Sequence, residues 1–347
     1  MNFYNRIVGD ERPYVIAEIG ANHNGDMELA RELILKAQEI GCDAVKFQSW
    51  TPESLIAKEE YDRNLSYSDS PKKHFGSLQE MVEKYYLRED QHVELKTFAD
   101  ELGIDFVSTP FCSAEVDLLE KLDVKFYKIA SMDINNLPFL KYVAGKGRPV
   151  VLSTGMASLS EIDKAVRVME SEGLNKIVLL HCISIYPPKL FDINLRNIDM
   201  LRRAFGYPVG FSDHTLGVAI PLAASALGAR IIEKHFTLDK GLPGWDHEIS
   251  ADPFEMKLLM KGSAEIWEAL GRENRIVSDA EREKRLKMRR SIVVRRDLSL
   301  GHVLTEDDLT AKRPGTGIPP DEIEFVIGRS LAVFKKADEL LKWEDLK

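Results

Sequence analysis

The stretch Ile231-Ile-Glu-Lys-His235 is the last of eight short apolar runs in the first 235 residues of this chain. Each run is rich in β-forming residues, and helix-length segments separate most of the runs, a pattern typical of parallel strands joined by crossover helices. The other seven are Tyr14–Glu18, Ala44–Gln48, Asp105–Thr109, Phe126–Ile129, Val150–Ser153, Ile177–His181 and Val209–Ser212. Eight such units predict a (β/α)8 TIM barrel, in which the carboxyl ends of all strands meet at one mouth.

The spacers between the runs carry helix signals of different clarity. Residues 28–40 and 160–172 place apolar residues at helical spacing, and Gly41 and Gly173 follow them as stop signals. Phe254–Leu270 reads as a closing helix. The long second spacer, Thr51–Leu78, has no clear period, so it is interpreted as a lid or substrate-binding loop, or as a tolerated surface insertion.

The composition and the pattern of the sequence change after the barrel. Residues 272–290 are dense in charge and predict a solvated linker or linker helix. Residues 291–347 carry the short runs Ser291–Val294 and Gly301–Leu304 and the turn-rich stretch Lys312-Arg-Pro-Gly-Thr-Gly317. We therefore predict three parts, a barrel over 1–271, a linker over 272–290 and a small β-rich domain over 291–347, the last near the lower size limit for folding alone.

Composition excludes several classes of function. The 347 residues are 44% hydrophobic and 30% charged, as in ordinary soluble globular proteins. A net charge of −9 argues against nucleic acid as a partner, and no apolar stretch is long enough to span a membrane. Three widely spaced cysteines and the lack of a signal-peptide pattern at the start make a reducing cytoplasm the expected location.

Polar residues suited to chemistry gather at the predicted strand ends. They are Glu18, Lys46, Gln48, Thr109, Lys128, Ser131, Ser153, His181, Ser212, His214, Glu233 and His235. Because strand ends meet at the barrel mouth, this inventory predicts an enzyme.

Two histidines, His214 and His235, end adjacent strands. Neighbouring strands lie about 4.8 Å apart, so both imidazoles could bind one divalent ion of the Mn, Co or Zn type, with water in the open positions and a carboxylate or His181 as a further ligand. The alternative is that each histidine is an ordinary polar residue at a strand end.

Two lysines, Lys46 and Lys128, stand within apolar strands. Burying an ammonium group is costly without a partner anion, so each is expected to face a carboxylate or a substrate in the lumen. Together with the hydroxyls of Thr109, Ser131, Ser153 and Ser212 they predict a phosphate or carboxylate cradle. The alternative reading of the hydroxyls is that they are turn and cap residues.

Two glutamates also lie in apolar strands. Glu18 is either the partner of a lysine or an acid–base group, and for Glu233 a structural pairing is favoured.

Motifs at every strand end resemble the sialic acid synthase family. They include Ala17-Glu-Ile-Gly-Ala-Asn-His-Asn-Gly25, Val45-Lys-Phe-Gln48, Ser108-Thr-Pro-Phe111, Tyr127-Lys-Ile-Ala-Ser131, Leu152-Ser-Thr-Gly-Met156, Gly210-Phe-Ser-Asp-His-Thr215 and Glu233-Lys-His-Phe-Thr237. Lys312–Gly317 resembles the family's C-terminal antifreeze-like (SAF) domain. The resemblance covers essentially the whole chain in order.

The resemblance implies a condensation of phosphoenolpyruvate with an N-acylated, mannosamine-like aldose, giving a nine-carbon keto acid and phosphate. It assigns Lys46, Thr109, Lys128, Ser131, Ser153 and Ser212 to phosphoenolpyruvate and Gln48, Asp133, Tyr186, Asp246 and Arg313 to the sugar. His214 and His235 would hold a divalent metal, expected to be Mn²⁺ with Mg²⁺ or Co²⁺ as alternatives, and Glu18 would be the catalytic carboxylate. Arg313 would reach in from the partner subunit of a domain-swapped homodimer.

The chain departs from the family pattern where the distal carbons of the sugar would lie. Ser131-Met-Asp133 stands where bacterial members carry Ser-Gly-Glu, and Cys182-Ile183 and Trp245 are further differences. The acceptor therefore stays open among N-acetylmannosamine, its 6-phosphate and a diacetamido-trideoxyhexose of the legionaminic or pseudaminic acid type.

Three other functions are compatible with these residues. One is a phosphoenolpyruvate-condensing barrel that makes a seven- or eight-carbon acid, and another is a Schiff-base aldolase that uses Lys128 or Lys234. The third is a non-catalytic sugar- or anion-binding protein.

Overall fold

The computed structural model describes residues 2–9, 11–65, 76–271 and 273–347. The chain divides into two compact units, Met1–Gly271 and Arg272–Lys347. No helix among the described residues is both long and apolar enough to cross a membrane.

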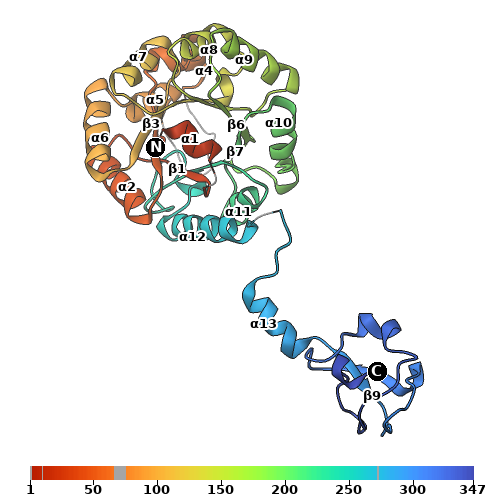
Figure 1. Cartoon of the computed structure of the whole chain (residues 1–347). Helices are drawn as coiled ribbons and strands as arrows, with labels where there is room; N and C mark the ends of the chain where they lie inside the picture. The colour runs from red at the N-terminus through yellow and green to blue at the C-terminus, as the bar shows by residue number, and fades with distance from the viewer. Residues whose placement is uncertain (1, 10, 66–75, 272) are drawn as a thin grey trace. The chain divides into compact units, whose positions relative to one another are not determined.

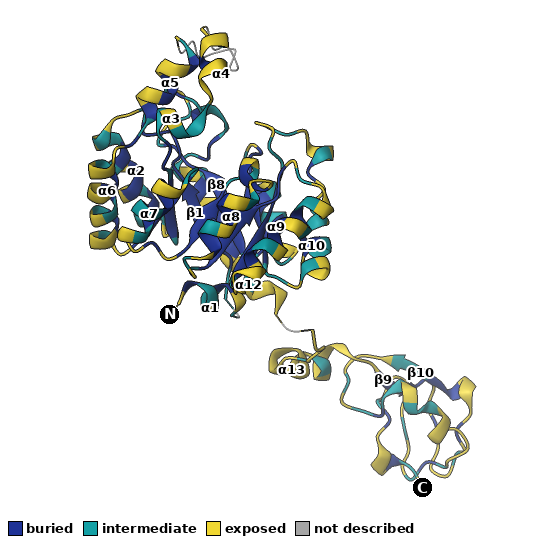
Figure 2. Cartoon of the chain, turned by 90° about the horizontal axis from the view of Figure 1, so that it is seen from above, coloured by how far each residue is buried: buried dark blue, intermediate teal, exposed yellow. Residues whose placement is uncertain are grey.

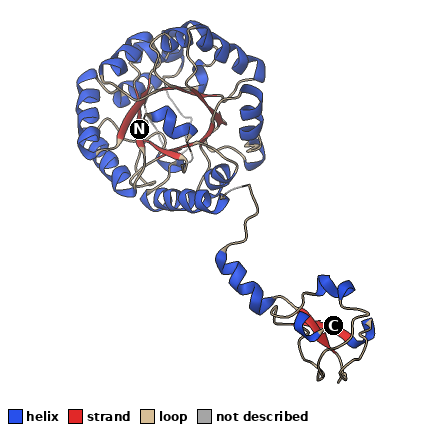
Figure 3. Cartoon of the chain, in the orientation of Figure 1, coloured by secondary structure: helices blue, strands red, loops and turns tan. Residues whose placement is uncertain are grey.

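The first unit is a ring of eight parallel strands in the order β3-β2-β1-β8-β7-β6-β5-β4, with β3 and β4 also in contact. The strands are β1 Tyr14–Glu18, β2 Ala44–Gln48, β3 Asp105–Thr109, β4 Tyr127–Ile129, β5 Val150–Ser153, β6 Ile177–Cys182, β7 Val209–Asp213 and β8 Ile231–His235. Figures 1 and 3 show this ring enclosed by helices. The predicted TIM barrel is confirmed.

The helices of this unit lie around the ring and at its two ends. They are α1 Phe3–Val8, α2 Met27–Ile40, α3 Pro52–Leu55, α4 Lys58–Arg63, α5 Leu78–Tyr85, α6 Glu89–Leu102, α7 Ser113–Lys121, α8 Leu137–Ala144, α9 Leu159–Ser171, α10 Asn197–Phe205, α11 Ala219–Ala226 and α12 Pro253–Leu270. The sequence signals act as expected at α2, where the Asp26 side chain caps the first turn and Gly41 ends the helix in the left-handed conformation (φ 90°).

Side chains alternate between the two faces of each strand. One apolar cluster fills the lumen at the end where the strands begin, and it includes Ile16, Phe126 and Ile231. The short helix α1 closes this end, because Phe3 stacks on Phe126 with ring centroids 3.9 Å apart. A larger cluster joins the outer faces of the strands to the helices. Figure 2 shows the strands as the buried centre of the unit.

The segment between β2 and α6 packs as a small lobe at the end of the barrel opposite α1 (Figure 2). Helices α3, α4 and α5 lie in it, and a separate apolar cluster that includes Trp50, Met81 and Tyr85 forms its core. Phe111 and Trp245, which come from other loops, pack against this cluster. The stretch that showed no clear period thus folds into short helices, and its residues 66–75 lie outside the described residues.

The second unit contains α13 Asp279–Met288 and an antiparallel pair, β9 Ser291–Val294 and β10 Leu309–Lys312. The charged run forms α13, which has no buried residue. The short run Gly301–Leu304, expected to be a strand, does not form one. Gly301 has φ 81°, and a single bridge joins Val303 to Ser330. An apolar cluster and the buried carboxylate of Asp308, which accepts bonds from Arg296, His302 and Thr305, hold these turns together.

Candidate active site

Charged and hydroxylic side chains occupy the lumen at the ends of the strands, where the mouth opens. Most of them follow an apolar lumen residue two positions earlier in the chain, and all are almost fully buried. They are Glu18, Lys46, Thr109, Lys128, Ser153, Ser212, Glu233 and His235. The strands therefore bring these sequence-predicted residues to one place.

Two lysines and two glutamates form one ionic network in this lumen. Lys46 Nζ lies 2.6 Å from Glu18 Oε2 and 3.9 Å from Glu233 Oε2. Lys128 Nζ lies 3.3 Å from Glu233 Oε1, which also accepts a hydrogen bond of 2.9 Å from Ser212. The expectation that each lysine faces a carboxylate is confirmed, and so is the structural pairing of Glu233.

The pKa values of the two glutamates are shifted in opposite directions. Burial raises the pKa of Glu18 above its ordinary value, although Lys46 acts against this shift. Burial also opposes ionisation of Glu233, but Lys128 and Lys46 outweigh it and hold the pKa of Glu233 below its ordinary value. Glu233 is thus a fixed anion, whereas Glu18 is the carboxylate that is better able to take up a proton.

Hydroxyl and amide groups also come together at the ends of β4, β5 and β6. The Ser131 hydroxyl, in the short turn Ser131–Asp133 (η1), accepts a hydrogen bond of 3.0 Å from the backbone amide of Gly155. A Cβ atom on Gly155 would collide with both Ser131 and Ser184. Ser153 Oγ is buried without a hydrogen-bond partner. Hydrogen-bond donors of this kind suit the oxygens of a phosphate or a carboxylate.

The two histidines converge at the ends of β7 and β8, with ring centroids 5.4 Å apart. His214 Nδ1 donates to the carbonyl of Ile183 (3.1 Å), which leaves Nε2 as an acceptor or ligand. His235 Nδ1 is buried without a hydrogen-bond partner. Burial lowers the pKa of His214 to about 4 and that of His235 well below its ordinary value, so both rings are neutral near pH 7.

Neutral rings with available nitrogen atoms fit a divalent ion. The described residues contain no group of three or more histidine, cysteine, aspartate or glutamate side chains arranged for a metal. An ion held by His214 and His235 would therefore have open positions for water or substrate, and His181 does not lie beside these two rings. It lies on the outer side of β6, where its Nε2 is 2.6 Å from the carbonyl of Ile193.

The residues predicted to contact a sugar do not all lie in one place. Gln48 donates to Glu18 (2.7 Å), and Asp246 Oδ2 lies 3.7 Å from His235 Nδ1. The Tyr186 ring stands edge-on to His214 with centroids 4.3 Å apart. Asp133 is buried beside Asn136, and its Oδ2 has no hydrogen-bond partner. Arg313 is exposed and lies in the second unit, directly after β10.

A polar network that was not predicted from the sequence joins the loops after β1 and β8. Asn22 donates to the carbonyl of Phe236 and to Ser250, and the Asn24 side chain contacts His247. The sequence signal was available, because Asn22-His-Asn24 follows β1 directly. This network fixes the loop that carries Asp246.

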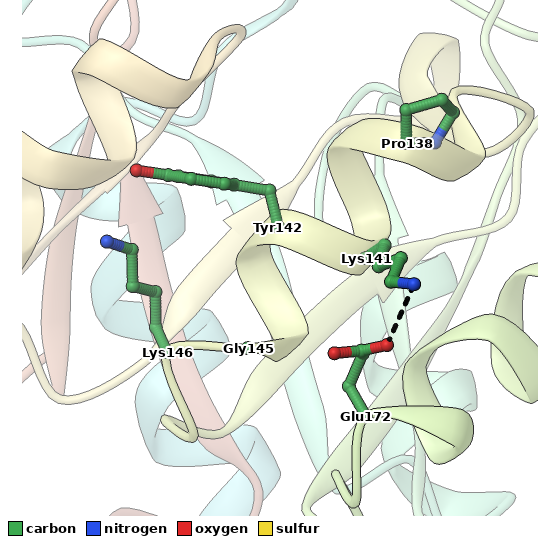
Figure 4. A pocket seen from close by; sticks show the side chains of 6 residues that line it. All are labelled: Pro138, Lys141, Tyr142, Gly145, Lys146 and Glu172. Carbon is green, nitrogen blue, oxygen red and sulfur yellow. Dashed lines mark ion pairs between the residues drawn. The ribbon is translucent and has the colours of Figure 1, made fainter.

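Two hollows lie outside the lumen. One of about 450 Å³ lies on the outside of the barrel, over α8 and the end of α9 (Figure 4). Its two lysines are already paired, Lys141 with Glu172 and Lys146 with Asp117. The other, of about 270 Å³, is lined by His181 and mostly apolar side chains near α9 and α10. Neither shares the ionic network of the mouth.

Comparisons with known proteins show which family the chain resembles. The NeuB family model matches residues 33–275 and the SAF domain model residues 289–347. N,N′-diacetyllegionaminic acid synthase of Legionella pneumophila is 42% identical over 96% of this chain and 94% of its own length. Human N-acetylneuraminate-9-phosphate synthase is 35% identical over 98% and 95%. The structure of a sialic acid synthetase from Leptospira borgpetersenii superposes with a TM-score of 0.70 at 35% identity, covering 80% of this chain and 91% of that one.

Proposed function

The chain belongs to the NeuB family, and on that premise we propose that it is a transferase that condenses phosphoenolpyruvate with an N-acyl-mannosamine-like aldose. The enol carbon of phosphoenolpyruvate attacks the aldehyde carbon and forms the new C–C bond. Water adds to the cationic carbon that this leaves, and the C–O bond to phosphate then breaks. The products are a nonulosonic acid and inorganic phosphate.

One observation carries this proposal: two buried lysines stand among hydroxyl donors in the lumen. Phosphoenolpyruvate is a polyanion, and Lys46, Lys128 and the hydroxyls of Thr109, Ser131, Ser153 and Ser212 offer it cations and hydrogen-bond donors. Glu233 pairs with both lysines and holds them in position before the substrate arrives. Preorganised charges of this kind stabilise charge that develops in the transition state.

Glu18 is the group proposed to handle the proton of the attacking water. Its carboxylate is 1% exposed and is held by Lys46 and Gln48, so its orientation is fixed. Burial raises its pKa, which makes it a better base than an exposed carboxylate. A carboxylate beside a developing cationic carbon also stabilises that charge.

His214 and His235 would hold a divalent ion, with Mn²⁺ as the first candidate and Mg²⁺ or Co²⁺ as alternatives. A bound ion of this kind polarises an aldehyde oxygen and so makes the aldehyde carbon more electrophilic. Asp246, 3.7 Å from His235, is the carboxylate proposed to contact the sugar hydroxyls. Gln48, Tyr186 and Asp133 complete the proposed sugar contacts.

The acceptor proposed first is a diacetamido-trideoxyhexose. The identity to the diacetyllegionaminic acid synthase is higher than that to the N-acetylneuraminate-9-phosphate synthase. Trp245 stands directly before Asp246, and its ring lies 6.2 Å from that of Trp50. This aromatic pair suits methyl and acetamido groups better than hydroxyls. N-acetylmannosamine and its 6-phosphate are the alternatives.

Phosphate release from phosphoenolpyruvate tests the reaction class and the acceptor together. Purified chain with Mn²⁺ should release phosphate only when an aldose is added, and the diacetamido sugar should give the highest kcat/KM of the three candidates. Equal activity with erythrose 4-phosphate or arabinose 5-phosphate would favour a shorter product. Trapping of pyruvate on the chain by borohydride would favour a Schiff-base aldolase instead.

Another copy of the chain is proposed as a protein partner. Exposed apolar side chains rim the loops that follow β4 to β7. They include Met132, Met156, Tyr186, Phe191 and Leu216. We propose that the SAF domain of a second copy covers this rim and brings Arg313 to the sugar.

Mixed variants test this arrangement. Arg313→Ala and Glu18→Gln chains should each lose most of their activity when assayed alone. If Arg313 acts across the dimer, a mixed dimer holds one site with both residues intact, so mixing should restore activity. If Arg313 acts within its own chain, every site lacks one residue and no activity returns.

A further inference from the structure

A buried ion pair lies directly behind the two histidines. Lys234 Nζ is 2.6 Å from Asp213 Oδ2, and the two side chains are 1% and 0% exposed. In the register of β7 and β8, Asp213 stands opposite Lys234. Each residue immediately precedes a histidine, so the ion pair faces the outside of the barrel while His214 and His235 face the lumen.

The same pair also ties down the turn that follows His214. Lys234 Nζ donates to the carbonyl of Thr215 (2.7 Å), and Asp213 Oδ1 accepts from the Thr215 amide (2.9 Å). The backbone is therefore fixed on both sides of His214, and the anchor is the neighbouring strand. These contacts leave His214 little freedom to move relative to His235.

Stability does not account for a pair of charges at this position. One step back along the same faces, the neighbours are Phe211 and Ile232, which belong to the apolar cluster between strands and helices. Removing two charges from water is expensive, and well-packed apolar residues at such positions are often as stabilising or more so. What the ion pair adds over an apolar pair is direction, because hydrogen bonds fix distances and angles.

We propose that Asp213 and Lys234 are positioning residues that hold the ends of β7 and β8 so that both imidazoles converge on one divalent ion. The inference rests on the metal site of the proposed function. Neither residue would touch the ion or the substrate. The pair would act through the backbone geometry of His214 and His235.

The test measures metal binding directly. Asp213→Leu/Lys234→Met replaces the pair by apolar side chains, and titration calorimetry with Mn²⁺ gives the dissociation constant in the absence of substrate. We expect binding to weaken by about 10- to 100-fold, the usual effect of losing a group that orients metal ligands. The visible absorption of bound Co²⁺, which reports ligand geometry, should change in shape. The circular dichroism spectrum should stay that of a folded barrel.

A matched control comes from the opposite end of the barrel. Arg12 Nη1 lies 2.7 Å from Asp43 Oδ2, and Asp43 also accepts from the Val15 amide, so this ion pair ties β1 to the start of β2. Arg12→Met/Asp43→Leu should leave the Mn²⁺ affinity and the Co²⁺ spectrum unchanged.

A second variant guards against loss of folding. Asp213→Asn has the same shape, but its amide offers one acceptor atom where Lys234 and Thr215 require two. It should weaken Mn²⁺ binding by about 10-fold.

The outcomes separate the two proposals. If the unmodified chain binds neither Mn²⁺ nor Co²⁺, the metal site itself is wrong. If the unmodified chain binds them and the folded variants bind with the same affinity and the same Co²⁺ spectrum, Asp213 and Lys234 are structural residues and the inference is overturned.

Discussion

The two ends of the barrel lumen differ in chemistry although the same strands build both. Near the start of the strands the lumen is filled by apolar side chains and closed by α1. Two residues further along, the same faces carry charge: Ile16 gives way to Glu18, Ala44 to Lys46, Phe126 to Lys128 and Ile231 to Glu233.

This contrast shows how one element serves stability and chemistry at once. The apolar end contributes burial, which favours folding. The charged end imposes a desolvation cost that only pairing and hydrogen bonds reduce. A step of two residues on one strand is enough to separate the two tasks. We therefore expect substitutions at the mouth to change rate and substitutions at the closed end to change stability.

The largest expected effect is at the mouth. His235→Ala should lower kcat/KM by about 10³-fold or more, because polarising an aldehyde supplies several kcal/mol of transition-state stabilisation. Chelation of the unmodified chain should abolish phosphate release, and Mn²⁺ should restore it. Full activity in excess chelator would contradict the metal assignment.

The next effect concerns Glu18. Glu18→Gln keeps the size of the side chain but removes the base, so kcat should fall by about 10²- to 10⁴-fold. Binding of phosphoenolpyruvate, followed by calorimetry, should persist because the lysines and hydroxyls remain. An unchanged kcat would make Glu18 a structural partner of Lys46.

The closed end should respond in the opposite way. Phe126→Ala removes the ring that stacks on Phe3, and the free energy of unfolding should fall by about 3–5 kcal/mol. Urea denaturation measures this loss, while kcat of the folded protein should stay within twofold of the original. A large loss of kcat without loss of stability would contradict the assignment of stability to the closed end and of rate to the mouth.

The smallest effect is a single hydrogen bond at the closed end. Tyr14 donates to Asp105 Oδ2 (2.6 Å), and Tyr14→Phe should cost about 1–2 kcal/mol. Burial and Asp105 raise the pKa of Tyr14 well above its ordinary value, so the fold favours the neutral phenol.

The pH dependence of that effect follows from the sign of the shift. Because the folded pKa is the higher one, the contribution of Tyr14 is complete below its unfolded pKa of about 10 and is lost as pH rises above it. Thermal unfolding between pH 9 and 11 should show a shallower decline for Tyr14→Phe. Identical slopes would mean that Tyr14 is not the group that titrates.

Much of this arrangement could be predicted from local patterns. The strands are predictable because each is a short apolar run. The bounds of β4, β6 and β7 differ from the predicted ones by one residue at one end. The convergence of Lys46, Lys128 and Glu233 followed from the rule that strand ends meet at one mouth.

Other features depend on contacts far apart in the sequence, which local patterns do not reveal. Nothing near Phe3 indicates that α1 packs against Phe126. The alternation of strand faces did hold unused information, since it turns Lys234 away from the lumen and makes it a poor Schiff-base candidate. In the second unit, apolar residues near Gly301 suggested a strand, but the glycine turns the chain there.

The helix α1 also has a consequence for the order in which the chain folds. During synthesis its residues leave the ribosome well before Phe126, and Arg230, which donates to the carbonyl of Ile7, follows later still. Contacts of such large sequence separation form slowly, because a long loop must close before they are made. Helix α1 thus waits for partners that are synthesised much later, and its apolar face stays exposed in the meantime, when a chaperone can bind it.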